Sequence, residues 1–132
     1  MPPLTRWYIK LALGYLVAAL SAGVWQAAGG PVWLTPVAIH LFVVGWITGM
    51  IFGVAYWMFP RFSKERPRGN SALAVATFAS LNTGLVLRVV AEAGGIGLLL
   101  VASALCQWLA GVGFVAGHLA AGEGAVKASC RG

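Results

Sequence analysis

Four long runs of apolar residues dominate this sequence and restrict the structures that it can form. They cover about residues 7–28, 36–59, 72–91 and 96–120. A helix that crosses a lipid bilayer needs about 20 mostly apolar residues, and each run reaches that length. The runs are continuous rather than alternating, which favours helices over the strands of a membrane barrel. We therefore expect an all-α polytopic membrane protein, a four-transmembrane-helix bundle that forms one domain over residues 1–132.

The composition argues against a soluble protein. Hydrophobic residues make up 60% of the chain and charged residues only 9%, whereas a soluble domain carries about 25% charged residues. So few charges could not cover a surface that faces water. The first run is also longer than the apolar core of a secretory signal peptide, so we expect it to remain as a membrane helix.

Basic residues gather on one side of the expected bilayer. Arg6 and Lys10 lie at the start of the first run, and Lys127 and Arg131 follow the fourth. The connection over residues 29–35 has no charge, whereas the next one is strongly basic. Its basic residues are Arg61, Lys64, Arg66 and Arg68. The positive-inside rule then places both termini in the cytoplasm, as in a multi-pass protein of the plasma membrane, the inner membrane of a bacterium. The net charge of +6 fits contact with anionic lipid, and we expect no nucleic-acid partner.

His40 is the most unusual residue within these runs. An ionisable ring inside a bilayer is costly and is a functional-site candidate by default. No second metal ligand lies near it in the sequence, so a single axial bond to haem iron fits better than a zinc or copper site. On a 3.6-residue wheel, the face below His40 is apolar and could take a bulky group, although such a face is more often core or lipid contact. That face holds Val44, Ile47, Ile51, Val54 and Met58.

The opposite face of the same run carries Gly45, Gly49 and Gly53. Glycines at this spacing let another helix backbone approach closely. We therefore expect the glycine face to pack inside the bundle, and the face of Val44, Ile47 and Ile51 to meet a second copy of the chain.

Arg88 and Glu92 lie near the outer end of the third run, at about the depth of His40. Two interpretations are open for them. They are four residues apart and can form an ion pair on one helix face, or Arg88 can bind a cofactor carboxylate such as a haem propionate. His118 lies near the inner end of the fourth run, about 25 Å from the depth of His40 at 1.5 Å per residue. We expect His118 to be an interfacial residue rather than a ligand.

The other polar residues suggest no further site. Asn82 and Gln107 lie in mid-membrane, where hydrogen bonds between helices are the simplest explanation. Cys106 and Cys130 have no paired spacing, so we expect a small buried residue and a free thiol.

The segment from His40 to Arg61 resembles the second helix of the catalytic subunit of the haem–copper oxidases, especially the nitric oxide reductase branch. The shared pattern is a His, a Gly-Trp pair, a further Gly, an aromatic pair and a closing Pro-Arg. Here these are His40, Gly45, Trp46, Gly53, Tyr56, Trp57, Pro60 and Arg61. The resemblance implies that His40 is an axial ligand of a low-spin haem near the outer face.

The chain departs from that family in two respects. The family subunit has about twelve helices, takes its second axial His from a far-downstream helix, and has a histidine cluster for a second metal. This sequence has four runs and no such cluster, so we expect neither oxygen nor nitric oxide reduction and no enzyme activity.

These features together predict a haem b-binding membrane protein that acts as an electron carrier or as a redox or gas sensor. The haem is expected to be non-covalent because there is no CxxCH motif, with His40 on the iron and Arg88, Val44 and Ile47 around the cofactor. We expect a homodimer that shares one haem between two His40 rings, together with a redox partner. The alternative is a non-haem structural or assembly subunit of a larger membrane complex.

Overall fold

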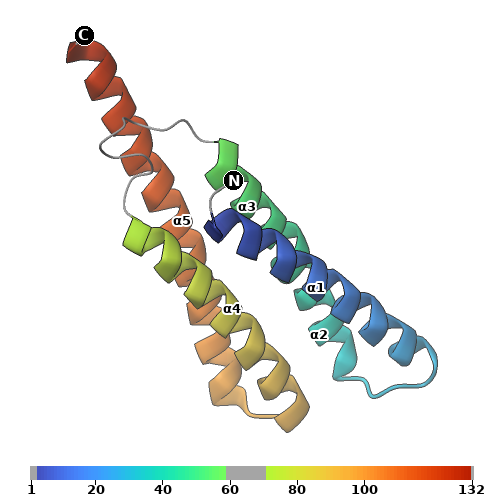
Figure 1. Ribbon diagram of the computed structural model, residues 1–132. Helices are drawn as coiled ribbons and strands as arrows, with labels where there is room; N and C mark the ends of the chain where they lie inside the picture. Colours follow the sequence, from blue (N-terminus) through green and yellow to red (C-terminus); the bar gives the residue numbers. More distant parts are fainter. Residues whose placement is uncertain (1–2, 59–70, 132) are drawn as a thin grey trace.

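The computed structural model describes residues 3–58 and 71–131, and within these ranges every regular element is a helix (Figure 1). The predicted basic residues of the connection 59–70, and Pro60 and Arg61 of the resemblance, lie outside the described residues. The elements are α1 (Pro3–Ala27), α2 (Leu34–His40), the π-helix η1 (Leu41–Thr48), α3 (Gly49–Met58), α4 (Ser71–Gly94) and α5 (Gly97–Arg131).

Among the described residues, four stretches of helix are long and apolar enough to cross a membrane, which confirms the predicted all-helical fold with four apolar spans. The second stretch is continuous from Leu34 to Met58 and consists of α2, η1 and α3. The predicted span ends agree with the observed ones, and the fourth span covers Gly97–Leu119. The helix α5 itself continues beyond that span to Arg131. Lys127 and Arg131 therefore lie on α5 and not beyond it.

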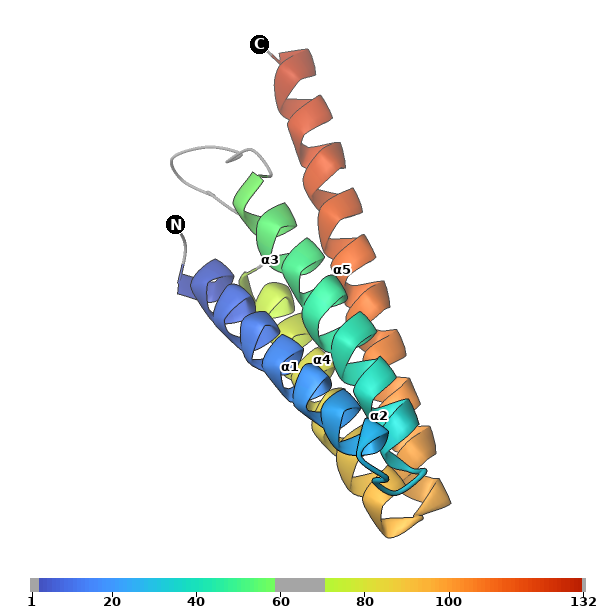
Figure 2. The same ribbon diagram turned by 90° about the vertical axis from the view of Figure 1, so that its right-hand side faces the viewer.

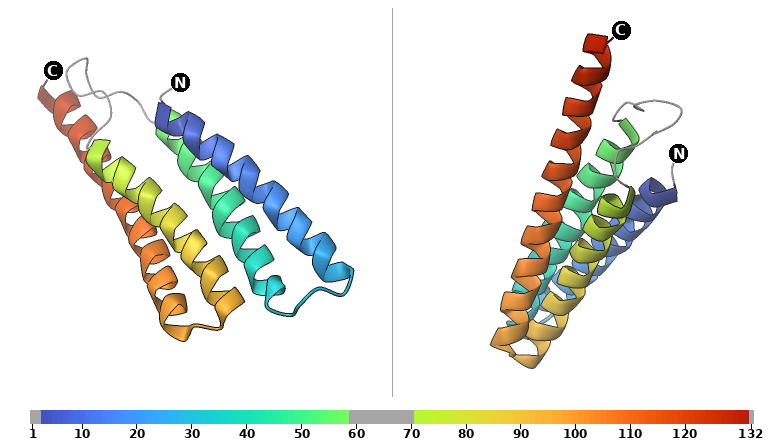
Figure 3. Two further views of the ribbon diagram at one scale, coloured as in Figure 1. Left: turned by 60° about the horizontal axis from the view of Figure 1, so that its bottom comes forward. Right: turned by 90° about the vertical axis from the view of Figure 1, so that its left-hand side faces the viewer.

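The helices form two antiparallel hairpins (Figures 1 and 2). One consists of α1 and the span α2–η1–α3, and the other of α4 and α5. Gly29 and Gly95 have positive φ angles of 95° and 64° in the two short turns, a conformation that glycine adopts without strain. Both turns lie at one end of the bundle, which we call the turn end. The start of α1 and the end of α5 lie at the opposite end, the terminus end (Figure 3).

Two clusters of side chains join the elements. At the terminus end, Tyr8, Phe52, Leu81 and Ala110 come from all four spans. The cluster nearer the turn end is made of smaller residues, Ala19, Val37 and Leu41, and Val89 of α4 packs against it. The hairpins are thus joined by aromatic rings at one end and mainly by aliphatic side chains at the other.

The three glycines of the second span allow α1 to pack closely against it. A Cβ atom added to Gly45 would lie 2.7 Å from Cγ of Tyr15, and one added to Gly53 would lie 2.8 Å from Cβ of Tyr8. At Gly49 the nearest atom would be Cβ of Ala12, at 3.4 Å. The predicted close packing of the glycine face inside the bundle is confirmed.

The π-helix keeps these glycines on one line. Residues four apart on an α-helix drift by about 40° around its axis, whereas a π-helix, with its i→i+5 hydrogen bonds, turns less per residue. The hydroxyl of Thr48 donates to the carbonyl of Val43, five residues earlier, at 3.1 Å. One buried row of the span therefore recurs every four residues and holds Leu41, Gly45, Gly49 and Gly53, with Phe52 buried beside it.

The same four-residue repeat corrects the predicted ligand face. The exposed row of the span holds Ile39, Val43, Ile47 and Ile51. Val44 belongs to a different row and packs against the cluster of Tyr8 and Phe52. Val44 and Ile47 therefore do not share a face, because the 3.6-residue wheel does not apply across a π-helix.

Candidate cofactor site at His40

His40 is the last residue of α2 and directly precedes the π-helix. Its Nδ1 atom lies 2.9 Å from the carbonyl oxygen of Pro36. A carbonyl can only accept, so Nδ1 carries the hydrogen and Nε2 of the neutral ring keeps its lone pair. Histidines that bind metals usually donate their other N–H to such an acceptor, and short π-helical segments are frequent at functional sites. The ring thus has the tautomer and the restraint that an axial ligand needs.

A histidine that binds no ligand can form the same kind of hydrogen bond to the carbonyl four residues earlier. His118 forms one with the carbonyl oxygen of Phe114 at 2.8 Å. The bond to Pro36 is therefore not specific on its own, and the surroundings of His40 must decide.

His40 begins a row that continues with Val44, Thr48 and Phe52. The ring of Phe52 stacks on Phe114 of α5, with centroids 3.9 Å apart and the planes 1° from parallel. Val44 packs against the cluster that includes Leu81 of α4. This row faces the hairpin of α4 and α5, so we infer that the half-buried His40 lies on that side of its span.

Arg88 forms the predicted ion pair with Glu92, with Nη2 and Oε1 2.7 Å apart. Both side chains are largely buried, with exposed fractions of 22% and 16%. The Nε atom of Arg88 is also buried, and it has no hydrogen-bond partner among the described residues. The ion pair therefore uses only part of the guanidinium, and Nε–H still needs an acceptor.

One helix contact relates Arg88 to His40. Val89, the neighbour of Arg88, packs against the cluster that contains Val37 and Leu41, and Leu41 is the neighbour of His40. The two polar residues therefore lie at the same level of the bundle, as the sequence predicted. Ile47 lies on the exposed row, so it can contact only a group outside the bundle.

His118 lies at the opposite end of the bundle. Its ring centroid is 5.3 Å from that of Tyr56 and 4.0 Å from that of Phe114. Tyr56 follows His40 by sixteen residues of continuous helix, or about 24 Å at 1.5 Å per residue. The predicted separation is confirmed, and the two histidines of one chain cannot bind the same haem iron.

No group of three or more His, Cys, Asp or Glu residues in the described part of the chain could hold a metal ion. An open apolar groove of about 300 Å³ crosses the lipid-facing side of α1 and the second span. It is lined by Ala19, Leu20, Ala38, Ile39, Phe42 and Val43, and His40 is not among the lining residues.

The mid-membrane polar residues behave mostly as expected. Tyr15 donates to Oδ1 of Asn82 at 2.6 Å and so joins the two hairpins. Gln107 instead donates to Ser103 of its own helix at 3.2 Å. The bond between helices α4 and α5 comes from Ser103, which donates to the carbonyl of Gly84 at 2.7 Å. The hydrogen bonds of Tyr15 and Ser103 were not predicted, although a serine in a membrane helix is a general signal for such bonds.

No family model matches the chain, and neither a curated protein nor a solved structure was found to be similar to it. The resemblance of the second span to the haem–copper oxidase family therefore has no support from these comparisons.

Proposed function

We propose that this chain is a haem b-binding membrane protein, an electron carrier or a redox or gas sensor, with Nε2 of His40 as the axial ligand. The observation that carries the proposal is the position of His40 at the start of the π-helix and at the level of Arg88, whose buried Nε atom has no hydrogen-bond partner among the described residues. A haem b would supply an iron that changes oxidation state and binds small gases. The protein would supply the position of the imidazole and the charge beside it.

Each candidate residue has a distinct part in this proposal. The carbonyl of Pro36 holds the His40 ring through Nδ1, so that Nε2 points away from the Pro36 carbonyl. Glu92 holds one edge of the Arg88 guanidinium and leaves Nε–H to donate to a carboxylate, which would satisfy that buried atom. Val44 would contact the haem on the bundle side of the span, and Ile47 would contact it on the exposed side.

The test is the absorption spectrum of the purified protein and of two matched variants. We expect a Soret band and b-type bands on reduction, most of which His40→Ala removes. His118→Ala is the control, since it makes the same change at the far end of the bundle and leaves the bands in place. Unchanged haem in His40→Ala, or loss of haem only in His118→Ala, would contradict the proposal.

We also propose that two copies share one haem between their His40 rings. Only one histidine per chain lies at this level among the described residues, so a second axial histidine would have to come from another copy. One haem per two chains and a low-spin spectrum that carbon monoxide leaves unchanged are expected. One haem per chain, or ready binding of carbon monoxide, would contradict the shared site.

The proposed orientation has both termini in the cytoplasm of a bacterial cell, with the chain in its plasma membrane. Its support is the distribution of basic residues, including Arg6, Lys10, Lys127 and Arg131 at the terminus end. Cys130 is exposed near the end of α5 and provides a natural probe. A membrane-impermeant maleimide should label Cys130 only after the cells are permeabilised, whereas a cysteine introduced by Ala28→Cys should react in intact cells.

The alternative, a structural or assembly subunit of a larger complex, is favoured by the outward face of α5. An open apolar groove of about 520 Å³ lies there along one helix. It is lined by Trp108, Gly111, Val112, Val115, Ala116 and Leu119. A colourless protein from a haem-competent host, which co-purifies with other membrane subunits, would favour this alternative.

A further inference from the structure

The outward face of α5 carries a continuous row of exposed apolar residues. Their spacing alternates between three and four residues, which is the repeat by which two helices pack along their whole length. Within the membrane span the row includes Val101, Leu105, Trp108, Val112, Val115 and Leu119. The same spacing leads on through Gly122 to Val126. Lipid covers such a row inside a bilayer, so its continuation outside the bilayer needs a different explanation.

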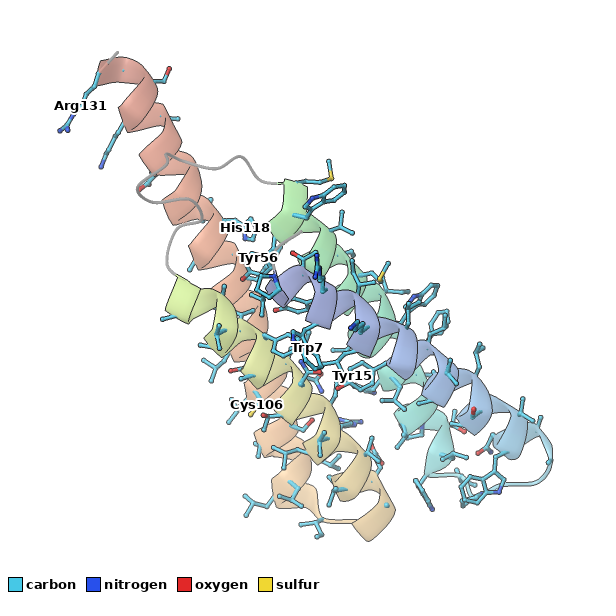
Figure 4. All side chains as sticks on the ribbon, in the orientation of Figure 1. Trp7, Tyr15, Tyr56, Cys106, His118 and Arg131 are labelled. Carbon is cyan, nitrogen blue, oxygen red and sulfur yellow. The ribbon has the colours of Figure 1, made fainter. Side chains whose placement is uncertain are left out.

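The row continues into a part of α5 that lies beyond the membrane span. The span ends at Leu119, whereas the helix ends at Arg131. This projecting end, residues 120–131, extends past the other helices (Figures 1 and 2), and Figure 4 shows Arg131 at its tip. Val126 is 64% exposed and lies about 10 Å past Leu119 at 1.5 Å per residue. Lipid tails cannot cover Val126, because the charged Glu123 lies between it and the span.

The projecting end has no packing partner in the described part of its own chain. The described side chains from Gly122 to Arg131 are all exposed. The neighbouring helix α4 begins at Ser71, and a Cβ atom added to Gly117 would already meet Leu73 in its first turn, at 3.4 Å. A helix of about 12 residues is only marginally stable in water, and Gly122 weakens it further. The projecting end therefore needs a surface to pack against.

The groove of about 520 Å³ on α5 has the form that helix pairing requires. In a parallel pair, each residue of the row enters a hole between four residues of the facing helix. Val112 would enter the hole formed by Trp108, Gly111, Val112 and Val115 of the other helix. Val115 would enter the next hole, formed by Val112, Val115, Ala116 and Leu119. These two holes together comprise all six residues that line the groove.

The same face supplies both the entering side chains and the holes, so it is complementary to a second copy of itself. Two copies inserted in the same direction pack in parallel, with each residue of the row at the level of its equivalent. The charges do not oppose this contact. Lys127 and Arg131 lie about 100° and 140° around the helix from Val126. Glu123 lies at one edge of the row, and a two-fold axis places its two copies on opposite sides of the contact.

We propose that α5 pairs with α5 of a second copy along this row, from the membrane span into the projecting end. The contact is on the outward face of α5, away from His40, and it does not depend on haem binding. A chain that also shares a haem through His40 has two neighbours, and the ratio of one haem to two chains is unchanged.

The test is disulfide cross-linking in lipid vesicles at a low ratio of protein to lipid, with both native cysteines replaced by serine. We expect oxidation by copper phenanthroline to link Val126→Cys into dimers much faster than Lys127→Cys, its neighbour off the row. Within the membrane, Val115→Cys should cross-link much faster than Val75→Cys, an equally exposed valine on α4.

Filling the groove gives a second, independent result. No atom of the chain lies within 4 Å of a Cβ added to Gly111, so Gly111→Leu leaves the single chain folded but blocks the hole that Val112 enters. It should abolish the dimers of Val126→Cys. Gly14→Leu on α1 is the matched control, since no atom lies within 4 Å of its added Cβ either, and it should leave the dimers in place.

Equal cross-linking on and off the row, or dimers that Gly111→Leu leaves unchanged, would overturn the proposal. A cross-link from Val126→Cys to a different protein in place of a second copy would also overturn it. The same measurements in His40→Ala separate this contact from the haem. Dimers through α5 should persist in that variant, and their loss there would show that the pairing follows the cofactor and not the row.

Discussion

The two ends of the bundle are built from different side chains. At the terminus end, rings from all four spans contact one another, and Phe52 stacks directly on Phe114 across the two hairpins. At the turn end, Val89 of α4 packs against the cluster of Ala19, Val37 and Leu41, and the closest backbone approaches between the two hairpins are those of α2 and η1 to α4. His40 and Arg88 lie at this end. Large rings therefore fill the space between the hairpins at the terminus end, whereas small side chains let the helices approach closely at the turn end.

Phe114→Ala offers the most severe test of this difference. This change removes the ring that contacts Phe52, Tyr56 and His118. We expect the free energy of unfolding to fall by about 3 kcal/mol. This value is at the lower end of the range for a core phenylalanine, because lipid replaces part of the lost contact. Thermal or denaturant unfolding in detergent measures it. Val115→Ala, next to it but facing outward, is the control, and equal losses in both variants would show that the ring contacts are not special.

Gly45→Ala should have the next largest effect. The new Cβ would lie 2.7 Å from the ring of Tyr15, which forces α1 away and costs about 1–3 kcal/mol, as overpacking does. Gly14→Ala is the matched control, since no atom lies within 4 Å of its added Cβ, and it should be neutral or slightly stabilising. A stable Gly45→Ala protein would mean that α1 and the second span can separate without loss.

Tyr15→Phe tests the hydrogen bond that joins the hairpins between the two ends. The change leaves Oδ1 of Asn82 without the donor that it has at 2.6 Å. Such bonds between membrane helices contribute about 0.6 kcal/mol on average, so the unfolding free energy should fall by that order. Ser21→Ala removes an exposed hydroxyl that bonds only its own helix and should have no measurable effect.

Arg88→Leu should have its most specific effect on the cofactor. Loss of one partner leaves the largely buried carboxylate of Glu92 unpaired, which destabilises the fold. Loss of the positive charge should also weaken haem retention or lower the reduction potential, because a cation near the haem favours the reduced state. Haem titration and a redox titration measure these effects. Arg6→Leu, at the other end, is the control, and identical behaviour of both variants would leave Arg88 with a structural role only.

The sequence was a good guide to the number of spans and to the burial of the glycine face, because apolar length and small-residue spacing act locally. It could not predict which side of the second span His40 occupies. That depends on the π-helix, whose i→i+5 hydrogen bonds have no clear signal in the residues of Leu41–Thr48. The hydrogen bond between Tyr15 and Asn82 was equally hidden, since it joins residues that are far apart along the chain.

The π-helix also limits which substitutions and deletions this span can accept during evolution. A substitution on its exposed row, such as at Val43, alters only the contact with lipid. Deletion of the same residue would turn everything before it, His40 included, around the helix axis relative to the glycines that hold α1. The second span should therefore accept many substitutions but no insertion or deletion. The orientation of His40 relative to the glycines depends on the number of residues between them and not on any one side chain.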